Sequence, residues 1–168
     1  RRYFKLMITG FHDNILKILH NPLTAFEIRT LQANIGYRCN MACHHCHVEA
    51  SPNRNETMDR ETMDAVLDVL KAHDIPTLDI TGGAPEMNPH FVYLVEEAKK
   101  AGRHVLVRTN LTIFSDHGFD HYPEFCSEHD IEITASLPHY LEGFVDRVRG
   151  EGAFGKSIEA IKGLNCLG

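Results

Sequence analysis

Three cysteines crowded into eight positions carry the clearest chemistry in the sequence. Cys39, Cys43 and Cys46 follow the spacing C-x3-C-x2-C. Three thiolates on one loop can bind three of the four irons of a 4Fe–4S cubane, and the fourth iron then has no protein ligand. An open iron can bind a substrate, whereas a structural metal site is usually closed by a fourth protein ligand. The spacing therefore predicts a cluster with one iron free for chemistry.

The competing interpretation is a zinc-stabilised α/β module that binds a partner and has no catalytic role. One of His44, His45 and His47, which flank the third cysteine, would complete a tetrahedral set with the thiolates. Such a module needs neither a Gly-Gly loop nor a hydroxyl at the rim of a sheet. The sequence has both, in Gly82-Gly83 and Ser136, and this combination favours the iron–sulfur interpretation.

Four short apolar segments must position these residues. We predict strands over residues 31–35, 77–80, 104–108 and 131–136, each followed by a loop and a helical pattern. Short strands separated by helices pair in parallel through right-handed crossovers. The predicted fold class is therefore α/β, a parallel (β/α) partial TIM-like barrel that is truncated after about four βα units.

Parallel sheets of this kind place their chemistry at the carboxyl ends of the strands. The Cys triplet follows the first predicted strand and Gly82-Gly83 follows the second. Thr109-Asn110 follows the third strand, and Ser136 ends the fourth. We therefore expect one site on one rim of the sheet.

Helix signals follow the strands. The first predicted helix covers residues 63–70 behind Asp59 as its N-cap. The second has Asn88 as N-cap and Pro89 at its first position. Two shorter helices are predicted, over residues 123–129 and 157–164.

The chain divides into a short extension and one core. Residues 1–27 are predicted to be an N-terminal extension with a short amphipathic helix around residues 14–20, and residues 28–168 are predicted to form the core. The sequence begins with Arg1 and stops at a helical pattern capped by Gly168. We therefore expect a fragment of a longer protein.

The composition is that of an ordinary globular protein, with 168 residues of which 43% are apolar and 24% charged. The net charge is −6 and Lys and Arg never run for more than two positions, so no nucleic-acid partner is expected. No apolar stretch has the length of a membrane span or signal peptide. Five cysteines, an odd number, suit a metal site in a reducing compartment, which predicts a cytoplasmic protein.

The Cys triplet after one strand and the Gly-Gly turn after the next resemble the radical S-adenosylmethionine (SAM) superfamily over about residues 30–168. The resemblance implies a partial (β/α)6 barrel with a 4Fe–4S cluster and SAM at its mouth. It implies an enzyme in which SAM chelates the open iron and an electron cleaves SAM to methionine and a 5′-deoxyadenosyl radical. The implied partner is an electron donor such as ferredoxin or flavodoxin.

The resemblance also assigns cofactor contacts to the predicted rim. His45 stands at the aromatic position before the third cysteine, where the family contacts adenine, and Gly82-Gly83 would offer carbonyls to the ammonium of SAM. Ser136 matches the ribose-binding position. Family members usually continue Gly-Gly with Glu, but here Ala84 follows and Glu86 comes two residues later as the candidate carboxylate.

An arginine is implied as the partner of the SAM carboxylate, because a guanidinium matches a carboxylate bidentately. The segment 146–150 resembles the stretch where many relatives place it, and we prefer Arg149, which is followed by glycine, to Arg147. Each assignment has an ordinary alternative: a solvated loop for the histidines, a simple turn for the glycines, a strand-end cap for Ser136 and a solvated face for the arginines.

Three segments, residues 36–48, 82–91 and 136–168, resemble more narrowly the radical SAM/Cys-rich family typified by the arsenosugar-biosynthesis enzyme. That resemblance implies transfer of the 5′-deoxyadenosyl group to a small substrate such as a methylated arsenical. A peptide-modifying radical SAM enzyme is the alternative. The family continues into two further βα units and a Cys-rich region that this sequence lacks.

Thr109, Asn110 and His139 are the candidate substrate contacts. Thr109 and His139 stand where that family commonly has cysteine, and both are expected to face the mouth of the barrel. Because trivalent arsenic prefers sulfur ligands, we predict weak or no activity on an arsenical. The alternative is that Thr109 is tied to the backbone at a strand end and His139 is a solvated loop residue.

Overall fold

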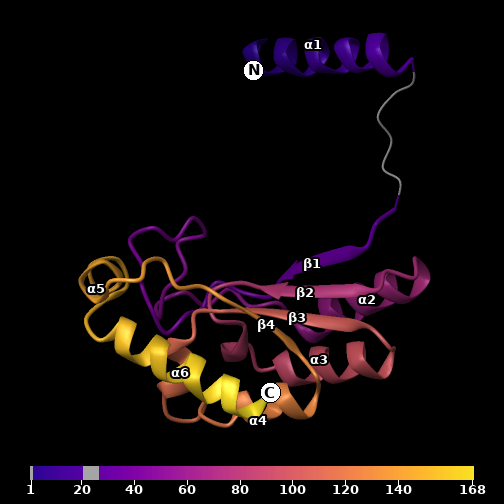
Figure 1. The fold of residues 1–168 in the computed structure, drawn as a ribbon. Helices are drawn as coiled ribbons and strands as arrows, with labels where there is room; N and C mark the ends of the chain where they lie inside the picture. Colours follow the sequence, from indigo (N-terminus) through magenta and orange to yellow (C-terminus); the bar gives the residue numbers. More distant parts are fainter. Residues whose placement is uncertain (1, 21–26) are drawn as a thin grey trace.

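Within the described residues, 2–20 and 27–168, four parallel strands form one sheet (Figure 1). In this computed structural model the strand order is β1-β2-β3-β4. The predicted α/β class and parallel topology are confirmed, and every strand end lies within one residue of its predicted position. The bounds are β1 (Thr30–Asn34), β2 (Thr77–Thr81), β3 (His104–Thr109) and β4 (Glu132–Ala135).

Apolar side chains alternate along the strands and face the helices. Leu78 and Ile80 of β2 are fully buried in the same core as Met63 of α2 (Arg60–Ala72). Figure 1 shows α2, α3 (Phe91–Lys100) and α4 (Tyr122–Glu128) on one side of the sheet. α2 begins as predicted, because Asp59 is its N-cap and accepts a hydrogen bond from the Thr62 amide at 2.9 Å.

The start of α3 differs from the prediction. His90 is the N-cap rather than Asn88, and Pro89 lies in the turn before the helix. The amide group of Asn88 is used elsewhere, since its Nδ2 donates to the carbonyl oxygens of Ile35 and Met58. Asn88, which the sequence suggested as an N-cap, therefore joins this turn to the loop after β1.

The chain after β4 holds a helix that the sequence did not predict. α5 (Glu142–Arg149) lies where only a glycine-rich loop was expected, and α6 (Ala153–Leu167) begins four residues before its predicted start. Only Val145 and Arg149 of α5 are buried, and the short helix contains few apolar residues, Phe144, Val145 and Val148 among eight. Two short 3-10 helices, η1 (Pro85–Met87) and η2 (Thr112–Ser115), follow β2 and β3.

The face of the sheet opposite to these helices carries charged side chains. Asp79 is only 4% exposed, and its carboxylate accepts hydrogen bonds from Gln32 Nε2 at 2.7 Å and from Arg108 Nε at 2.9 Å. Burial alone would raise the pKa of Asp79, but the bonds from Arg108 and Gln32 hold it below its ordinary value. In a barrel this face would line the interior, where it forms a polar layer.

Helix α1 (Arg2–Leu19) is longer than the helix predicted around residues 14–20. The division between an extension and a core at residue 28 stays a prediction. None of the helices in the described ranges combines the length and the apolar character that a membrane crossing requires.

Candidate functional site

The loop after β1 carries the three cysteines and is fixed along its backbone. Cys39 is buried, and Cys43 and Cys46 are half-buried. The amide of Cys39 donates to Ser51 O at 3.2 Å, and the amide of Cys46 donates to Cys43 O at 3.1 Å. The amide of Ala50 donates to the sulfur of Cys46 at 3.3 Å. We refer to residues 36–58, which fold back on themselves through these bonds, as the Cys loop.

The glycine pair after β2 holds the Cys loop by close backbone contact. The Gly83 amide donates to Gly36 O at 3.0 Å, and the Ala84 amide donates to Arg38 O at 2.9 Å. A Cβ at Gly83 would lie 2.4 Å from Arg38 O. At Gly82, where φ is +153°, a Cβ would lie 2.6 Å from Gly36 O. Only glycine fits at either position, so the pair does more than turn the chain.

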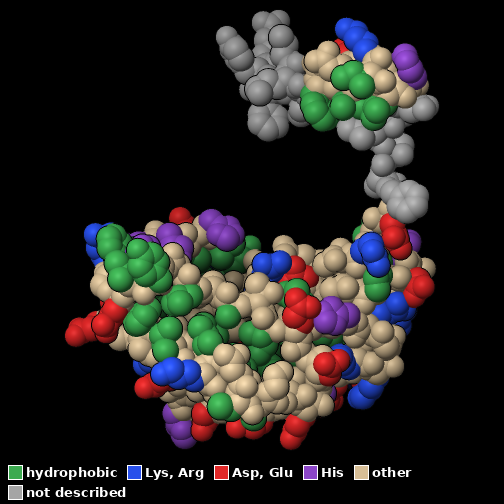
Figure 2. Space-filling model, viewed as in Figure 1, with side chains coloured by type: hydrophobic (Ala, Val, Ile, Leu, Met, Phe, Trp, Pro, Cys, Tyr) green, Lys and Arg blue, Asp and Glu red, His purple; other side chains and the backbone are tan. Residues whose placement is uncertain are grey.

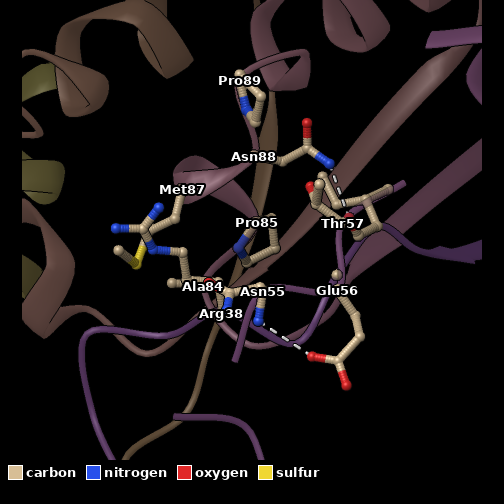
Figure 3. Close-up of a pocket in the computed structure, with 11 residues that line it drawn as sticks. Arg38, Asn55, Glu56, Thr57, Ala84, Pro85, Met87, Asn88 and Pro89 are labelled. Atoms are coloured by element: carbon tan, nitrogen blue, oxygen red, sulfur yellow. Dashed lines mark hydrogen bonds between the residues drawn. The ribbon is translucent and has the colours of Figure 1, made fainter. Parts of the chain in front are cut away.

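A buried asparagine holds both ends of the Cys loop. Asn88 Nδ2 donates to Ile35 O at 2.7 Å and to Met58 O at 3.1 Å, while its Oδ1 accepts from the His90 amide at 2.8 Å. Figure 3 shows Asn88 at the edge of a small cavity of about 180 Å³ between the Cys loop and η1. Asn88 thus fixes where the chain leaves β1 and where it returns toward α2.

A larger cavity of about 600 Å³ lies between the Cys loop and the carboxyl ends of the strands. Its volume is in the range of small-molecule sites. The structure brings eight predicted site residues together in its lining: Cys39, Cys43, His45, Cys46, Gly83, Asn110, Ser136 and Arg149. The rest of the lining is mostly apolar: Met41, His47, Ala50, Ala135, Leu137 and Pro138. Gly82 supports the site from outside this lining.

Arg149 closes the cavity from the last turn of α5. Nη1 donates to Ser136 O at 2.6 Å and to Asn110 O at 3.3 Å, and Nη2 donates to Ser136 Oγ. Nε is buried and has no partner among the described residues. Arg147, by contrast, lies over the ring of Phe144, with its guanidinium carbon 4.8 Å from the ring centroid. Of the two arginines, Arg149 reaches the cavity and has an unused donor.

Burial and one cation govern the ionisation of the thiols. Burial raises the pKa of Cys39 and of Cys43 above the ordinary thiol value, and the charge of Arg149 opposes this effect at Cys43. Burial lowers the pKa of Arg149, whereas the two cysteines act in the opposite direction. A cation beside a thiol favours the thiolate, which is the form that binds metal.

The donor set fits an iron–sulfur cluster. The sulfur of Cys46 receives a hydrogen bond from a backbone amide, and the sulfur of Cys39 receives one from Asn110 Nδ2 at 3.4 Å. Hydrogen bonds to the sulfurs are a normal part of cluster sites. Across residues 2–20 and 27–168, no three His, Cys, Asp or Glu side chains are placed to bind one metal ion. A cubane puts each cysteine on a different iron, so it does not need the thiols to meet at one point.

Glu86 does not line the cavity, contrary to its predicted cofactor contact. It is 3% exposed, and neither carboxylate oxygen makes a hydrogen bond of ordinary geometry with the described residues. Burial raises the pKa of Glu86 to about 7, although its own backbone amide and the Thr109 side chain act to lower it. Since Gly83 and Ala84 face the Cys loop, the turn of η1 directs the next acidic side chain into the core.

Two of the three predicted substrate contacts also lie outside the cavity lining. Thr109 is 3% exposed and its Oγ1 accepts from the Leu111 amide at 3.2 Å, so the expectation that it faces the mouth is wrong. Strand alternation explains this, because Asn110 points to the cavity and its neighbour points to the helices. His139 stacks on Tyr140 and on Phe144, each with ring centroids 4.5 Å apart.

An exposed apolar patch borders the Cys loop. Tyr140, Leu141 and Phe144 are 77%, 46% and 46% exposed. Figure 2 shows hydrophobic side chains gathered over α5 on this side of the molecule. The His44 amide donates to Val148 O at 3.0 Å, which ties α5 to the Cys loop. The patch and the three thiols therefore share one end of the molecule.

A family model described as the Radical SAM superfamily matches residues 33–167, which is most of the chain. The chain belongs to the radical SAM superfamily. Members of this superfamily use a 4Fe–4S cluster and SAM, and the cavity described above contains the donors that such cofactors need.

The chain is also similar to individual proteins of several different functions. It is 28% identical to the antilisterial bacteriocin subtilosin biosynthesis protein AlbA of Bacillus subtilis (strain 168), and the 133 aligned residues cover 79% of this chain and 29% of AlbA. It is 30% identical to mycofactocin maturase MftC of Mycobacterium ulcerans (strain Agy99), over 79% of this chain and 35% of MftC. It is 29% identical to a probable GTP 3′,8-cyclase of Saccharolobus islandicus (strain Y.N.15.51 / Yellowstone #2), over 84% of this chain and 45% of the cyclase. The chain thus spans less than half the length of each.

Solved radical SAM structures share the fold. Streptococcus suis SuiB bound to SAM matches with a TM-score of 0.67 and 17% identity, over 98% of this chain and 37% of SuiB. Native anSMEcpe with bound AdoMet matches with a TM-score of 0.66 and 20% identity, over 82% of this chain and 41% of that protein. These likenesses support the partial-barrel fold.

Sequence reasoning missed a polar network behind Cys39. Asn40 Nδ2 donates to Thr112 Oγ1 at 3.1 Å and to Asp116 Oδ2 at 2.8 Å. Lys156 of α6 lies 3.4 Å from the other oxygen of Asp116. The available signal was a polar amide directly after the first cysteine and the polar residues Asn110, Thr112 and Asp116 after the third strand, which parallel topology places at the same rim.

Proposed function

We propose that the protein cleaves SAM reductively at a 4Fe–4S cluster bound by Cys39, Cys43 and Cys46. The observation that carries the proposal is the single cavity in which the three thiols lie with Gly83, Ser136 and Arg149. When bound, the cluster supplies the electron that converts SAM to methionine and a 5′-deoxyadenosyl radical. Membership of the superfamily supports the same chemistry.

The side chains of the cavity have separate tasks in this proposal. The three thiolates occupy three irons and leave the fourth for the amino and carboxylate groups of SAM. The buried, unpaired Nε of Arg149 is a charged donor for the carboxylate. His45, exposed at the rim, offers a ring to the adenine. Met41, Leu137 and other apolar lining residues reduce the access of water to the reacting carbon.

A peptide is the substrate class that we favour. AlbA and MftC are named for bacteriocin biosynthesis and for mycofactocin maturation, which supports a maturase role for this chain's protein. The GTP cyclase makes a nucleotide the alternative. The interpretation that the substrate is an arsenical rests on the motif resemblance alone. Thr109, one of the two positions where that family has cysteine, is buried, so a thiol there would not reach the cavity.

Anaerobic reconstitution with iron and sulfide tests the cluster. We expect a brown protein with broad absorption near ~400 nm that releases 5′-deoxyadenosine from SAM when reduced. Cys43→Ala should abolish both signals, and Cys126→Ala, at a buried cysteine outside the cavity, should leave both intact. A colourless protein that binds one zinc ion would overturn the proposal and restore the zinc module.

Hydrogen abstraction distinguishes the substrate classes. The full-length reconstituted enzyme is incubated with SAM and a perdeuterated peptide mixture, with GTP, or with dimethylarsinous acid. We expect deuterium in 5′-deoxyadenosine from the peptide arm, and no new product from GTP or from dimethylarsinous acid in the other two arms. A cyclised GTP product or an adenosylated arsenical would overturn the peptide proposal while leaving SAM cleavage in place.

A further inference from the structure

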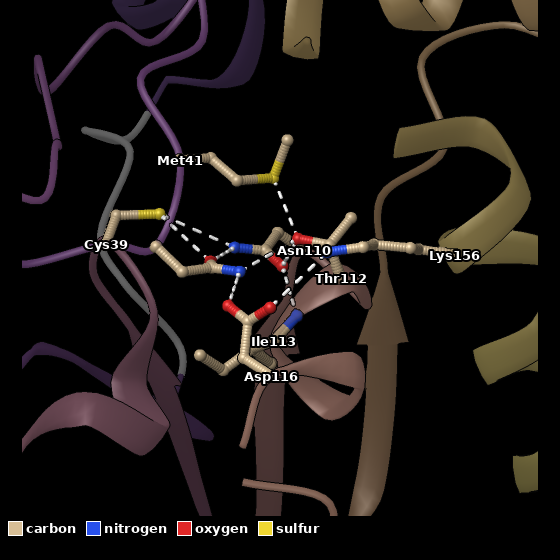
Figure 4. Close-up of polar contacts among 8 residues, drawn as sticks. Cys39, Met41, Asn110, Thr112, Ile113, Asp116 and Lys156 are labelled. Carbon is tan, nitrogen blue, oxygen red and sulfur yellow. Dashed lines mark hydrogen bonds and ion pairs between the residues drawn. The ribbon is translucent and has the colours of Figure 1, made fainter. Parts of the chain in front are cut away.

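We propose that Asn110 sets the reduction potential of the cluster through a hydrogen bond to the sulfur of Cys39. The inference rests on the proposed function in one respect, namely that the three thiols bind the cluster. Asn110 was expected to contact substrate, but its own contacts assign it a positioning and electrostatic role. Its amide lies between the Cys loop and η2, directly behind the first cysteine (Figure 4).

The orientation of the Asn110 amide follows from its neighbours. Its Oδ1 accepts from the backbone amide of Ile113 at 3.2 Å, and a backbone amide can only donate. Its Nδ2 must therefore point the other way, where it lies 3.4 Å from Cys39 Sγ and 2.8 Å from Asn40 Oδ1. The sulfur of Cys39 thus faces a donor.

The amide of Asn40 confirms this direction independently. Its Nδ2 donates to Asp116 Oδ2 at 2.8 Å, and a carboxylate can only accept. The oxygen of Asn40 therefore faces Asn110 and requires a donor from it. The Ile113 amide fixes the orientation of Asn110, and the Asp116 carboxylate fixes the orientation of Asn40. Both orientations require Asn110 Nδ2 to donate to Asn40 Oδ1.

The network is anchored at its far end. Asp116 Oδ1 lies 3.4 Å from Lys156 Nζ of α6, and Thr112 Oγ1 lies 3.0 Å from Asn110 Oδ1 and 2.9 Å from Met41 Sδ. Both hydrogens of the Asn110 amide are used within the protein, and its oxygen accepts from the Ile113 amide. The amide has no free donor with which to recognise a substrate, and it cannot turn without breaking several bonds.

An N–H···S bond favours the reduced state of a cluster. Reduction adds negative charge that is shared with the thiolate sulfurs, and a donor aimed at one of them stabilises that charge. Cys39 is 6% exposed, so the bond acts in a medium that screens it less than water does. Removal of the donor should make the cluster harder to reduce.

The two hydrogen-bonded sulfurs differ in what controls them. Cys46 Sγ receives its bond from the Ala50 backbone amide, which persists with almost any side chain at that position. Cys39 Sγ depends on the side chain at residue 110. Residue 110 is therefore a position at which the sequence itself adjusts the potential.

The test is an EPR-monitored redox titration of the reconstituted full-length protein. For Asn110→Ala we expect about a tenfold lower ratio of reduced to oxidised cluster at the midpoint of the unsubstituted protein, which is a negative shift of about 59 mV for one electron. Asn110→Asp cannot donate and adds negative charge, so its shift should be larger. Thr112→Val, which loosens the amide without removing it, should shift the midpoint less in the same direction.

Asn88→Ala is the matched control, because Asn88 also holds the Cys loop but bonds only backbone groups. We expect lower stability and an unchanged midpoint. A shift as large as that of Asn110→Ala would assign the effect to general loosening and overturn the inference. An unchanged midpoint in Asn110→Ala and Thr112→Val with full iron content would also overturn it. Failure of the unsubstituted protein to assemble any cluster would instead overturn the proposed function, and this inference with it.

Discussion

The Cys loop is held differently on its two sides. On the β2 side, the backbone at Gly82-Gly83 meets the backbone of the loop with no space for a side chain. On the β3 side, the amides of Asn40 and Asn110 make the contact through side-chain hydrogen bonds. The first side therefore fixes the shape of the site. The β3 side consists of side-chain contacts, so single substitutions can alter it. These substitutions can adjust the electrostatics of Cys39 without loss of the fold.

A methyl group at residue 83 should have the largest effect on stability and on iron content, because the β2 side of the Cys loop has no space for a side chain. In Gly83→Ala the new Cβ would lie 2.4 Å from Arg38 O and 3.0 Å from Cys39 Cβ, so the loop must move. We expect a loss of about 3–4 kcal/mol in the free energy of unfolding and a severalfold lower iron content. Urea unfolding and iron per chain measure both quantities.

Gly163→Ala is the control for that substitution. Gly163 lies inside α6, and a Cβ added to it would meet no other atom within 4 Å, so alanine should stabilise the helix by up to about 1 kcal/mol. Full iron content in Gly83→Ala would break the comparison, since the β2 side would then tolerate a side chain.

Glu86, which follows the glycine pair, should make stability depend on pH. Its pKa is raised by burial from 4.5 to about 7. Between these pH values the unfolded chain has released a proton that the folded chain keeps. The free energy of unfolding should therefore fall as pH rises, by up to about 3 kcal/mol, and level off above pH 7. Urea unfolding from pH 4.5 to 7.5 should show this slope in the native protein and lose it in Glu86→Gln. Parallel profiles of the two proteins would contradict the assignment.

Asn88 and Asn110 allow the two sides of the Cys loop to be compared with the same residue type. Asn88→Ala removes a buried donor to two backbone carbonyls, which should cost about 1–3 kcal/mol. Asn110 is half-buried, and its replacement should cost about 1 kcal/mol or less. Thermal unfolding of the metal-free proteins measures the difference. A greater loss of stability in Asn110→Ala than in Asn88→Ala would mean that the side-chain contacts on the β3 side determine the shape of the Cys loop.

The smallest effect is expected at the surface end of the network. Lys156 is half exposed and lies 3.4 Å from Asp116, so Lys156→Gln should change stability by no more than about 0.5 kcal/mol. The cluster midpoint should move less than in Asn110→Ala. Unfolding at low and high salt provides the check, and a loss above about 1 kcal/mol at both would show that this ion pair is structural.

The sequence was sufficient to locate the strands and the rim of the site. Short apolar runs separated by helices leave parallel pairing as the consistent topology, and this topology places the Cys loop, Asn110 and Ser136 at one end of the sheet. It could not separate Thr109 from Asn110, because neighbours in a strand point to opposite faces and the end of the strand decides which one reaches the cavity.

Other features needed the three-dimensional structure. The three-residue turn of η1 sends Glu86 inward, and no pattern of residue types shows the direction of such a turn. α5 is short and mostly polar, and the contact of Arg149 with Ser136 spans thirteen positions, so neither the burial of Arg149 nor this contact could be read from spacing. The network from Cys39 to Lys156 joins residues 40 to 76 positions apart along the chain, which local patterns do not record.

The bond between the His44 amide and Val148 O has a consequence for biosynthesis. It joins the Cys loop to a helix made much later, and ribosomes add residues at about 5–20 per second. Cys46 is therefore synthesised about 5–20 s before Arg149. During that interval the nascent chain presents three thiols without the wall that α5 later provides, open to oxidants and to whatever metal it meets. Completion of α5 reduces this exposure, although Cys43 and Cys46 stay half-buried at the cavity, so the order of translation determines when the cysteines gain this wall.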